Sequence, residues 1–181
     1  MRTVESLVQD VVAARARYLA ALGEPSPEQA VFKPTVDAWS LTELTEHMTL
    51  AEQVGINGIW RALEGYRTGR PVWRGEPVHR GRPIEDVIAA TWRDREVVPA
   101  IAAPKWGGPL PYWAAALRAC APVLEALGHE HGGVDLDAVV YPHPISGPLD
   151  AGQRLEFLRF HLDRHAAQVA RVRGEAAFPR D

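Results

Sequence analysis

The feature that most constrains this chain is the helical spacing of its apolar residues. In four long stretches the apolar side chains recur three or four positions apart, which places them on one face of an α-helix. Each such face must be buried against another element, so these helices must pack on one another. The four stretches cover about residues 4–22, 40–67, 110–127 and 150–173, and a shorter one covers residues 84–98.

Capping signals mark the start of two of these helices. Ser40 opens the second stretch and Glu43 follows three positions later, which is the spacing of a capping box. Asp150 and Gln153 repeat this arrangement at the start of the last stretch. Both helices are therefore predicted to begin beside these residues.

Glycine and proline interrupt the helical pattern at informative places. Gly55 and Gly58 lie near the apolar face of the second stretch, which indicates either close approach of another backbone or a local bend. Pro83 suits the first position of the short helix. Pro122 is expected to kink the last turns of the helix over residues 110–127 or to end it early.

The connections between the predicted helices are long, over residues 23–39, 68–83 and 128–149. An idealised up-down bundle has tight loops, so these segments suggest crossovers or the rim of a pocket. The stretch AVVY, at residues 138–141, could be extended, but a single extended piece makes no sheet. We therefore predict an all-α fold, a four-helix bundle with long connecting loops and a short extra helix.

Length and composition indicate one globular domain and exclude several classes of protein. The chain has 181 residues, of which 46% are hydrophobic, and we expect one domain over residues 1–174 with a C-terminal tail at 175–181. The net charge of −3 gives no general attraction to nucleic acid or acidic lipid. A single cysteine, Cys120, excludes a disulfide framework and the cysteine-based zinc motifs. The charged N-terminal stretch and the lack of a long apolar run predict a cytoplasmic protein without a membrane span.

Residues 67–82 form a basic loop that is rich in proline and glycine. Its arginines surround Trp73, and basic residues interleaved with an aromatic one can bind an anion or single-stranded nucleic acid. A solvated surface loop explains the same composition. The negative net charge favours that interpretation, so no nucleic-acid partner is predicted. The arginines of the loop are Arg67, Arg70, Arg74, Arg80 and Arg82.

Three histidines fall at the apolar faces of two predicted helices. His161 and His165 are one turn apart on the last helix, so both rings can converge on one ion. His47, on the second helix, would complete a three-imidazole set with an open coordination position. Alternatively, all three are core histidines with hydrogen-bond partners, because buried rings need partners for their nitrogens. The spacing alone leaves both interpretations open.

Two motifs resemble signatures of the DinB-like (DinB/YfiT) superfamily. Residues 38–53 read AWSLTELTEHMTLAEQ, a Trp-Ser helix start followed by a histidine among apolar residues. Residues 143–172 read HPISGPLDAGQRLEFLRFHLDRHAAQVARV, with a His-Pro lead-in and two histidines four apart before a glutamine. The resemblance extends over about residues 1–173 and implies a four-helix bundle. It also implies that His47, His161 and His165 bind a divalent metal ion.

The resemblance implies a metal site more directly than it implies a reaction. Three neutral imidazoles suit zinc or nickel, with manganese as a further option. The resemblance implies the activities of characterised family members, which look like thiol-dependent transferases and isomerases. The thiol is a low-molecular-weight one such as bacillithiol, mycothiol or glutathione. We therefore expect a metal-dependent thiol transferase that acts on a small-molecule substrate. A metal-dependent hydrolase and a non-enzymatic metal- or ligand-binding stress-response bundle are the alternatives.

His143, in the HPISG motif, is the candidate for a residue that lies near the metal without binding it. A plain loop histidine is the other interpretation of this residue. The family resemblance also makes a homodimer plausible, although no sequence feature demonstrates one. The sequence assigns no catalytic acid, base or substrate-binding residue.

Overall fold

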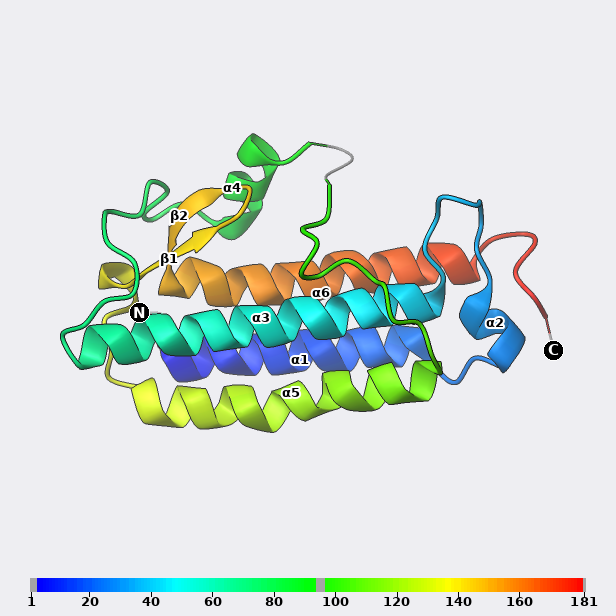
Figure 1. The fold of residues 1–181 in the computed structure, drawn as a ribbon, viewed down its shortest axis with the longest axis horizontal. Coiled ribbons are helices and arrows are strands. Elements are labelled where there is room, and N and C mark those ends of the chain that lie inside the picture. The colour runs from blue at the N-terminus through cyan, green and yellow to red at the C-terminus, as the bar shows by residue number, and fades with distance from the viewer. Residues whose placement is uncertain (1–2, 94–96, 181) are drawn as a thin grey trace.

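Four long helices run side by side along the length of the molecule (Figure 1). The computed structural model describes residues 3–93 and 97–180. The prediction of an all-α bundle with short additions is confirmed, since the described residues contain a single two-stranded sheet. The elements are α1 (Val4–Leu22), α2 (Pro27–Val31), α3 (Leu41–Arg67), α4 (Ile84–Thr91), α5 (Leu110–His131), a 3-10 turn (Leu136–Ala138), β1 (Val140–His143), β2 (Gly147–Asp150) and α6 (Ala151–Arg173).

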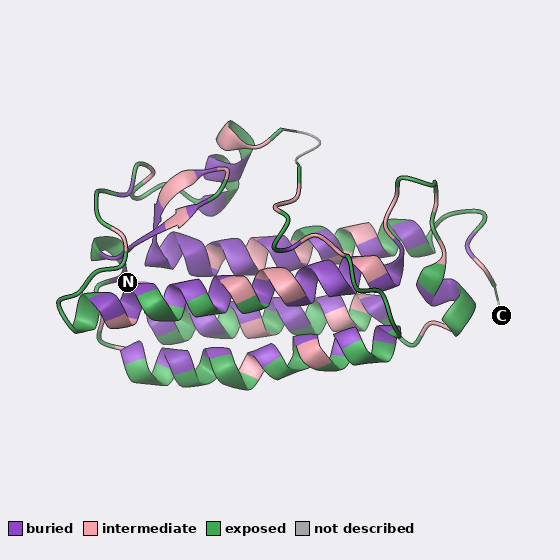
Figure 2. Ribbon diagram, viewed as in Figure 1, coloured by how far each residue is buried: buried purple, intermediate pink, exposed green. Residues whose placement is uncertain are grey.

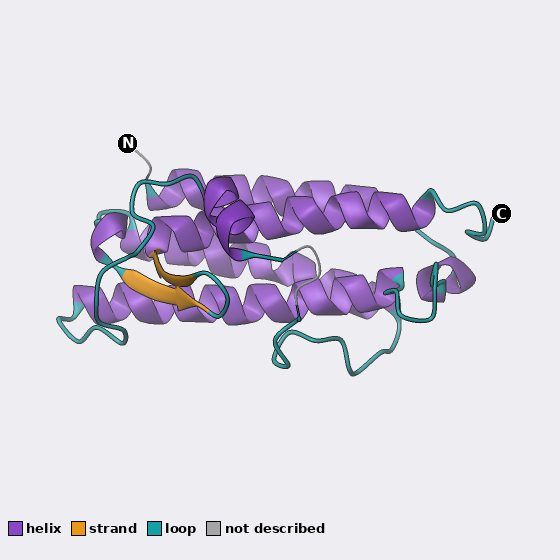
Figure 3. Cartoon of the chain, turned by 90° about the horizontal axis from the view of Figure 1, so that it is seen from above, coloured by secondary structure: helices purple, strands orange, loops and turns teal. Residues whose placement is uncertain are grey.

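The order of the helices requires one connection to cross the whole bundle. α1 and α6 run in one direction, and α3 and α5 run in the opposite direction (Figure 1). Around the bundle α1 packs on α6, α6 on α3, α3 on α5 and α5 on α1. The chain between α3 and α5 must therefore return along the length of the molecule. This crossover carries α4, which packs on α6, and Figure 3 shows α4 and the hairpin on the same side of the bundle.

Side-chain caps fix the starts of α3 and α6 as predicted. The Ser40 hydroxyl accepts the N–H of Glu43 at 3.2 Å, while the Glu43 carboxylate accepts the N–H of Ser40 at 2.9 Å. Asp150 and Gln153 form the same reciprocal pair at the start of α6. Each box satisfies N–H groups that the first turn of a helix leaves without partners. These caps set the register of the two helices that carry the candidate histidines.

The apolar stripes of the four long helices meet along the centre of the bundle (Figure 2). The predicted close approach of another backbone at the two α3 glycines is not what the structure has, because side chains lie against both. A Cβ at Gly58 would lie 2.1 Å from atoms of Tyr141, and a Cβ at Gly55 would lie 2.7 Å from Leu158. Side chains of β1 and α6, rather than a second backbone, occupy the space. None of the described helices combines the length and the apolar character that crossing a membrane requires.

The prediction that residues 128–149 form a loop without a sheet is wrong in two respects. α5 continues to His131, because Pro122 is accommodated inside the helix and does not end it. β1 pairs with β2 as an antiparallel hairpin, in which Gly147 adopts a φ of +74° after the turn. The second strand begins with Gly-Pro, a composition typical of turns rather than strands. Its pairing with β1 therefore has no clear signal in the sequence.

Two shorter elements also differ from the prediction. α4 ends at Thr91 rather than at residue 98, and residues 94–96 of that predicted helix lie outside the described residues. α2 occupies a segment that was predicted as a polar link. It begins with a capping box of Ser26 and Gln29 and with Pro27 at its first position. Its five residues are too few to display a helical apolar stripe.

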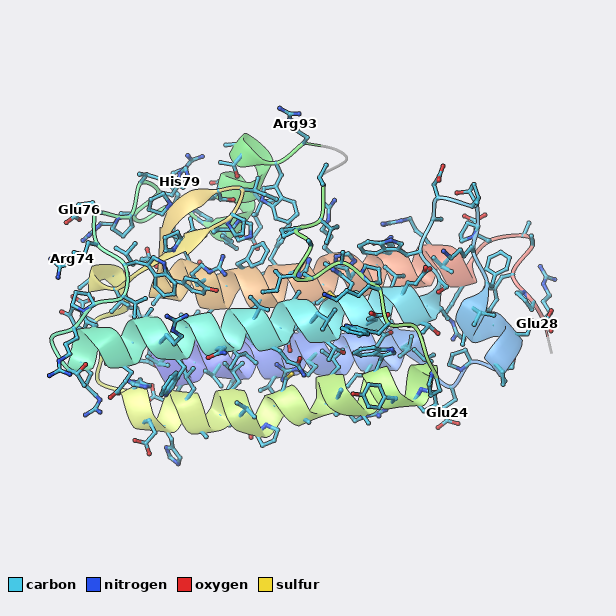
Figure 4. The ribbon with its side chains drawn as sticks, viewed as in Figure 1. Glu24, Glu28, Arg74, Glu76, His79 and Arg93 are labelled. Carbon is cyan, nitrogen blue, oxygen red and sulfur yellow. The ribbon has the colours of Figure 1, made fainter. Side chains whose placement is uncertain are left out.

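The basic loop lies beside the hairpin at one end of the molecule. Figure 4 shows Arg74, Glu76 and His79 on this loop. The amide nitrogen of Gln153 donates to the backbone oxygens of His79 and Arg82 at 2.7 and 3.0 Å, which ties the loop to the start of α6. These contacts agree with the interpretation of a surface loop.

Candidate metal centre

α3 and α6 bring three buried histidine rings together. His161 Nε2 lies 3.3 Å from His47 Nε2 and 3.1 Å from His165 Nε2. One ring nitrogen of each histidine lies within 4.8 Å of the corresponding atoms of the other two, and none of the residues is more than 7% exposed. The three histidines singled out by the sequence therefore form one cluster, and this cluster can hold a metal ion.

Two of the rings are oriented by hydrogen bonds from their other nitrogen. His47 Nδ1 lies 2.8 Å from the Ala102 backbone oxygen, which can only accept, so Nδ1 carries the proton. His165 Nδ1 donates in the same way to the Gln168 side-chain oxygen at 2.9 Å. In the neutral rings, Nε2 of His47 and of His165 is then a bare lone pair. A single proton on His161 Nε2 can satisfy one of them and not both, so a cation is the natural partner of the cluster.

Burial keeps these imidazoles neutral. Desolvation lowers the pKa of His47, although its hydrogen bond to Ala102 acts in the opposite direction. Desolvation and the neighbouring His47 ring lower the pKa of His165 to about 3. Desolvation, followed by the two neighbouring rings, holds the pKa of His161 well below its ordinary value. Because a metal ligand must have a free lone pair, rings that are already neutral at pH 7 suit this role.

The spacing of the ring nitrogens fits a transition-metal ion. Zinc–nitrogen bonds of about 2.0–2.1 Å in a tetrahedral site separate neighbouring nitrogens by about 3.3 Å. The two Nε2–Nε2 distances to His161 are 3.3 and 3.1 Å. Neutral imidazoles are good ligands for zinc and nickel and weaker ones for manganese. The spacing and the donor atoms therefore suit a divalent transition-metal ion.

A buried carboxylate fixes the segment that holds His47. Glu46 is fully buried, and its carboxylate accepts the backbone N–H groups of Lys105 and Trp106, each at 2.7 Å, and of Gly107 at 2.9 Å. This anchored part of the crossover begins three residues after Ala102, whose oxygen accepts the hydrogen bond from His47 Nδ1. Glu46 therefore fixes this part of the crossover by hydrogen bonds, and the crossover in turn orients the ring of the adjacent residue, His47.

The histidine cluster lies in the wall of a cavity of about 590 Å³, which is the size of a small-molecule site. Helices α3 and α6, the crossover and the turn of the hairpin line this cavity. Aromatic rings flank the cluster within it. The Trp39 ring is centred 4.9 Å from His47, and the Phe157 ring stacks on His161 at 5.3 Å. A small ligand in the cavity can therefore reach the three rings.

His143 lies in the same cavity but outside the cluster. Its ring is centred 4.4 Å from Phe157, and its Nδ1 accepts the backbone N–H groups of Ile145 and Ser146 at 3.2 and 3.1 Å. It is not among the residues whose ligand atoms come together. A position near the metal without a bond to it remains the prediction for this residue.

The groups that orient the rings were not identified from the sequence. The Ala102 oxygen belongs to the backbone of the crossover, so no side-chain pattern could reveal it. Gln168 does carry a signal, because it follows His165 by three positions on the same helix face. Glu46 carries no such signal, because helical spacing places it on the opposite side of the helix from Leu44 and Met48.

Replacing Gln168 by alanine is expected to weaken metal binding by about 10-fold, because a ring without its outer hydrogen bond is less well oriented. The dissociation constant of zinc, measured by competition with a chromophoric chelator, checks this. Gln53→Ala, an exposed glutamine on α3, is the matched control and should leave the constant unchanged. Equal constants for the wild type and Gln168→Ala would show that the hydrogen bond does not support the ligand.

Comparison with known proteins identifies the family. Neither a curated protein nor a solved structure matches the chain. A family model described as the DinB superfamily matches residues 11–169, which include all of α3 and α5 and most of α1 and α6. The match extends over both helices that carry the histidine cluster, as the resemblance of the two motifs implied. The chain therefore belongs to the DinB superfamily.

Proposed function

We propose that His47, His161 and His165 bind one divalent metal ion, zinc or nickel with manganese as a further option. We further propose that the protein is a metal-dependent transferase that uses a low-molecular-weight thiol. The observation that carries the proposal is the convergence of three Nε2 atoms at the wall of a small-molecule cavity. A structural zinc site uses four protein ligands. In the described part of the chain no fourth histidine, cysteine or carboxylate joins the three.

A divalent ion in this cluster would lower the pKa of a thiol ligand and so raise the fraction of reactive thiolate. The chain would position the metal ion, since Ala102 and Gln168 hold two of the ligand rings in place. In the transfer, the thiol proton leaves to solvent and the sulfur forms a bond to an electrophilic carbon. The leaving group departs from that carbon with the bonding electron pair.

The cavity favours thiol transfer over hydrolysis, because hydrolysis needs a group that moves protons to the leaving group. Among the described residues that line the cavity, only Asp37 has a carboxylate, and it is exposed. Both oxygens of Glu46 are occupied by backbone N–H groups. A thiolate can attack without such a base, so we place the hydrolase second.

Tag-free protein loaded with zinc or nickel tests the proposal. It is mixed with glutathione, bacillithiol or mycothiol and with 1-chloro-2,4-dinitrobenzene, and the thioether product is measured. At pH 7 a free thiol is only a few per cent ionised, so full ionisation alone would speed conjugation by about 30-fold. The acceleration should shrink as the pH approaches about 8.5, because the free thiol then ionises without help.

His161→Ala with the same added metal is the control, and it should react at the rate of the free thiol. Failure of every thiol with a fully loaded wild-type protein would contradict the transferase and leave the metal site standing. Metal-dependent hydrolysis of 4-nitrophenyl acetate in that case would favour the hydrolase.

A further inference from the structure

A buried arginine lines the same cavity, and no described carboxylate forms an ion pair with it. Arg154, in the first turn of α6, is 5% exposed, and its Nε and Nη1 have no hydrogen-bond partner among the described residues. Its guanidinium lies over the Tyr141 ring, 4.0 Å from the centre, and forms no ion pair within the described part of the chain. A buried charge is costly unless it is paired. The described residues therefore supply no anion for this guanidinium, and a bound ligand can provide one.

His143 adds a fixed donor beside this arginine. Its Nδ1 accepts the N–H groups of Ile145 and Ser146, so the proton of the neutral ring lies on Nε2. Burial, together with the charge of Arg154, lowers the pKa of His143 to about 3 and keeps the ring neutral. The ring centre of His143 and the guanidinium carbon of Arg154 lie 4.4 and 5.5 Å from the centre of the same Phe157 ring.

Phe157 also relates this pair to the metal centre. It stacks on His161 at 5.3 Å, so Arg154, Phe157 and His161 follow one another along one face of α6. Arg154 and His161 are seven residues apart on α6. The helix rises about 10 Å over that distance, so Arg154 and the His161 ring are separated by about this much along the cavity wall. Among the described residues that line the cavity, Asp37 alone has a carboxylate, and it is exposed. No described carboxylate inside the cavity therefore competes with an anion for Arg154.

We propose that Arg154 and His143 form a subsite for the carboxylate of a thiol ligand whose sulfur reaches the histidine cluster. The binding of the sulfur at the histidine cluster rests on the proposed function. The binding of the carboxylate rests on Arg154 and His143. One buried cation with one neutral donor matches a monoanion better than a phosphate dianion. The ligand is accordingly a thiol carboxylic acid with its two ends about two helical turns apart.

A pair of matched probes tests the subsite in the cobalt-loaded protein. 6-Mercaptohexanoate carries the carboxylate, and 6-mercaptohexanol has a hydroxyl group in its place. Dissociation constants are measured by calorimetry, while the near-ultraviolet absorption of cobalt reports whether sulfur binds the metal. We expect the wild type to prefer the acid by about 10- to 100-fold, as one buried charge-assisted contact would give.

Arg154→Met should bring this preference close to one, and His143→Phe should reduce it by a few-fold. Arg164→Met, at an exposed arginine of the same cavity, should preserve it. Equal affinity of the folded wild type for the two probes would overturn the subsite without any variant. A preference that disappears in Arg164→Met instead would overturn it as well.

The two readouts separate this inference from the proposed function. A preference for the acid without a sulfur-to-cobalt band supports the subsite and contradicts the thiol transferase. A band without a preference supports the thiol ligand and contradicts the subsite. Loss of both signals contradicts both proposals.

Discussion

Replacing His161 by alanine is expected to reduce the metal content of the purified protein from about one ion per chain to almost none. His161 is the central member of the cluster, because its Nε2 lies within 3.3 Å of the Nε2 atoms of both other rings. Structural zinc sites are worth about 10–16 kcal/mol over four ligands, or about 3 kcal/mol for each. Loss of one ligand should then weaken binding by about 150-fold.

Elemental analysis of tag-free protein measures this loss, with the dissociation constant of zinc as a second readout. His131→Ala is the matched control, since His131 is a buried histidine on α5 outside the cavity. It should retain its metal. One ion per chain in His161→Ala, or no metal in the wild type after incubation with zinc, nickel and manganese, would contradict the metal centre. The three histidines would then be core residues.

The histidine cluster could be predicted from the sequence because it depends on local geometry. His161 and His165 share a face of any helix that includes both, and the apolar stripe around His47 directs it inward. Once α6 packs on α3, the three rings lie together, and no other part of the sequence is needed to predict this. The caps at Ser40 and Asp150 are local in the same sense, since a stretch of four residues suffices to recognise each.

The rest of the site depends on contacts between distant segments. Ala102 reaches His47 only because the crossover returns along the bundle, a consequence of the direction in which α3 and α5 run. The hairpin places His143 and Tyr141 beside Arg154, yet its second strand has the composition of a turn. In the sequence Arg154 is an ordinary helix-start arginine. Its burial arises from the elements that pack over it, and none of the described carboxylates is brought to it.

A second buried charge lies in the core of the bundle, where Arg15 of α1 meets Glu52 of α3. Arg15 is 2% exposed and Glu52 is fully buried, and Arg15 Nε donates to Glu52 Oε2 at 2.7 Å. Arg15 Nη1 and Glu52 Oε1 have no hydrogen-bond partner among the described residues. Burial raises the pKa of Glu52 to about 7, although Arg15 acts in the opposite direction. The attraction between the two charges therefore offsets only part of the free-energy cost of burying them.

Glu52→Ala is expected to lower the free energy of unfolding by about 3–5 kcal/mol, because it leaves a buried guanidinium without a partner. The double variant Arg15→Met/Glu52→Leu should recover most of this loss or exceed the wild type by about 1–4 kcal/mol, since apolar side chains of similar size need no partner. Urea unfolding followed by circular dichroism measures both. Arg17→Met is the matched control, because it breaks the exposed pair with Asp163 and should cost no more than about 1 kcal/mol.

The three variants together decide why the pair is buried. If desolvation outweighs attraction, the single variant is far less stable than the double variant, and the apolar pair can replace the ionic one. A double variant as unstable as Glu52→Ala would contradict this, and would mean that Arg15 and Glu52 are required for the packing of the bundle core. Retention of one metal ion in the double variant is expected in either case, because neither residue lines the cavity that contains the histidine cluster.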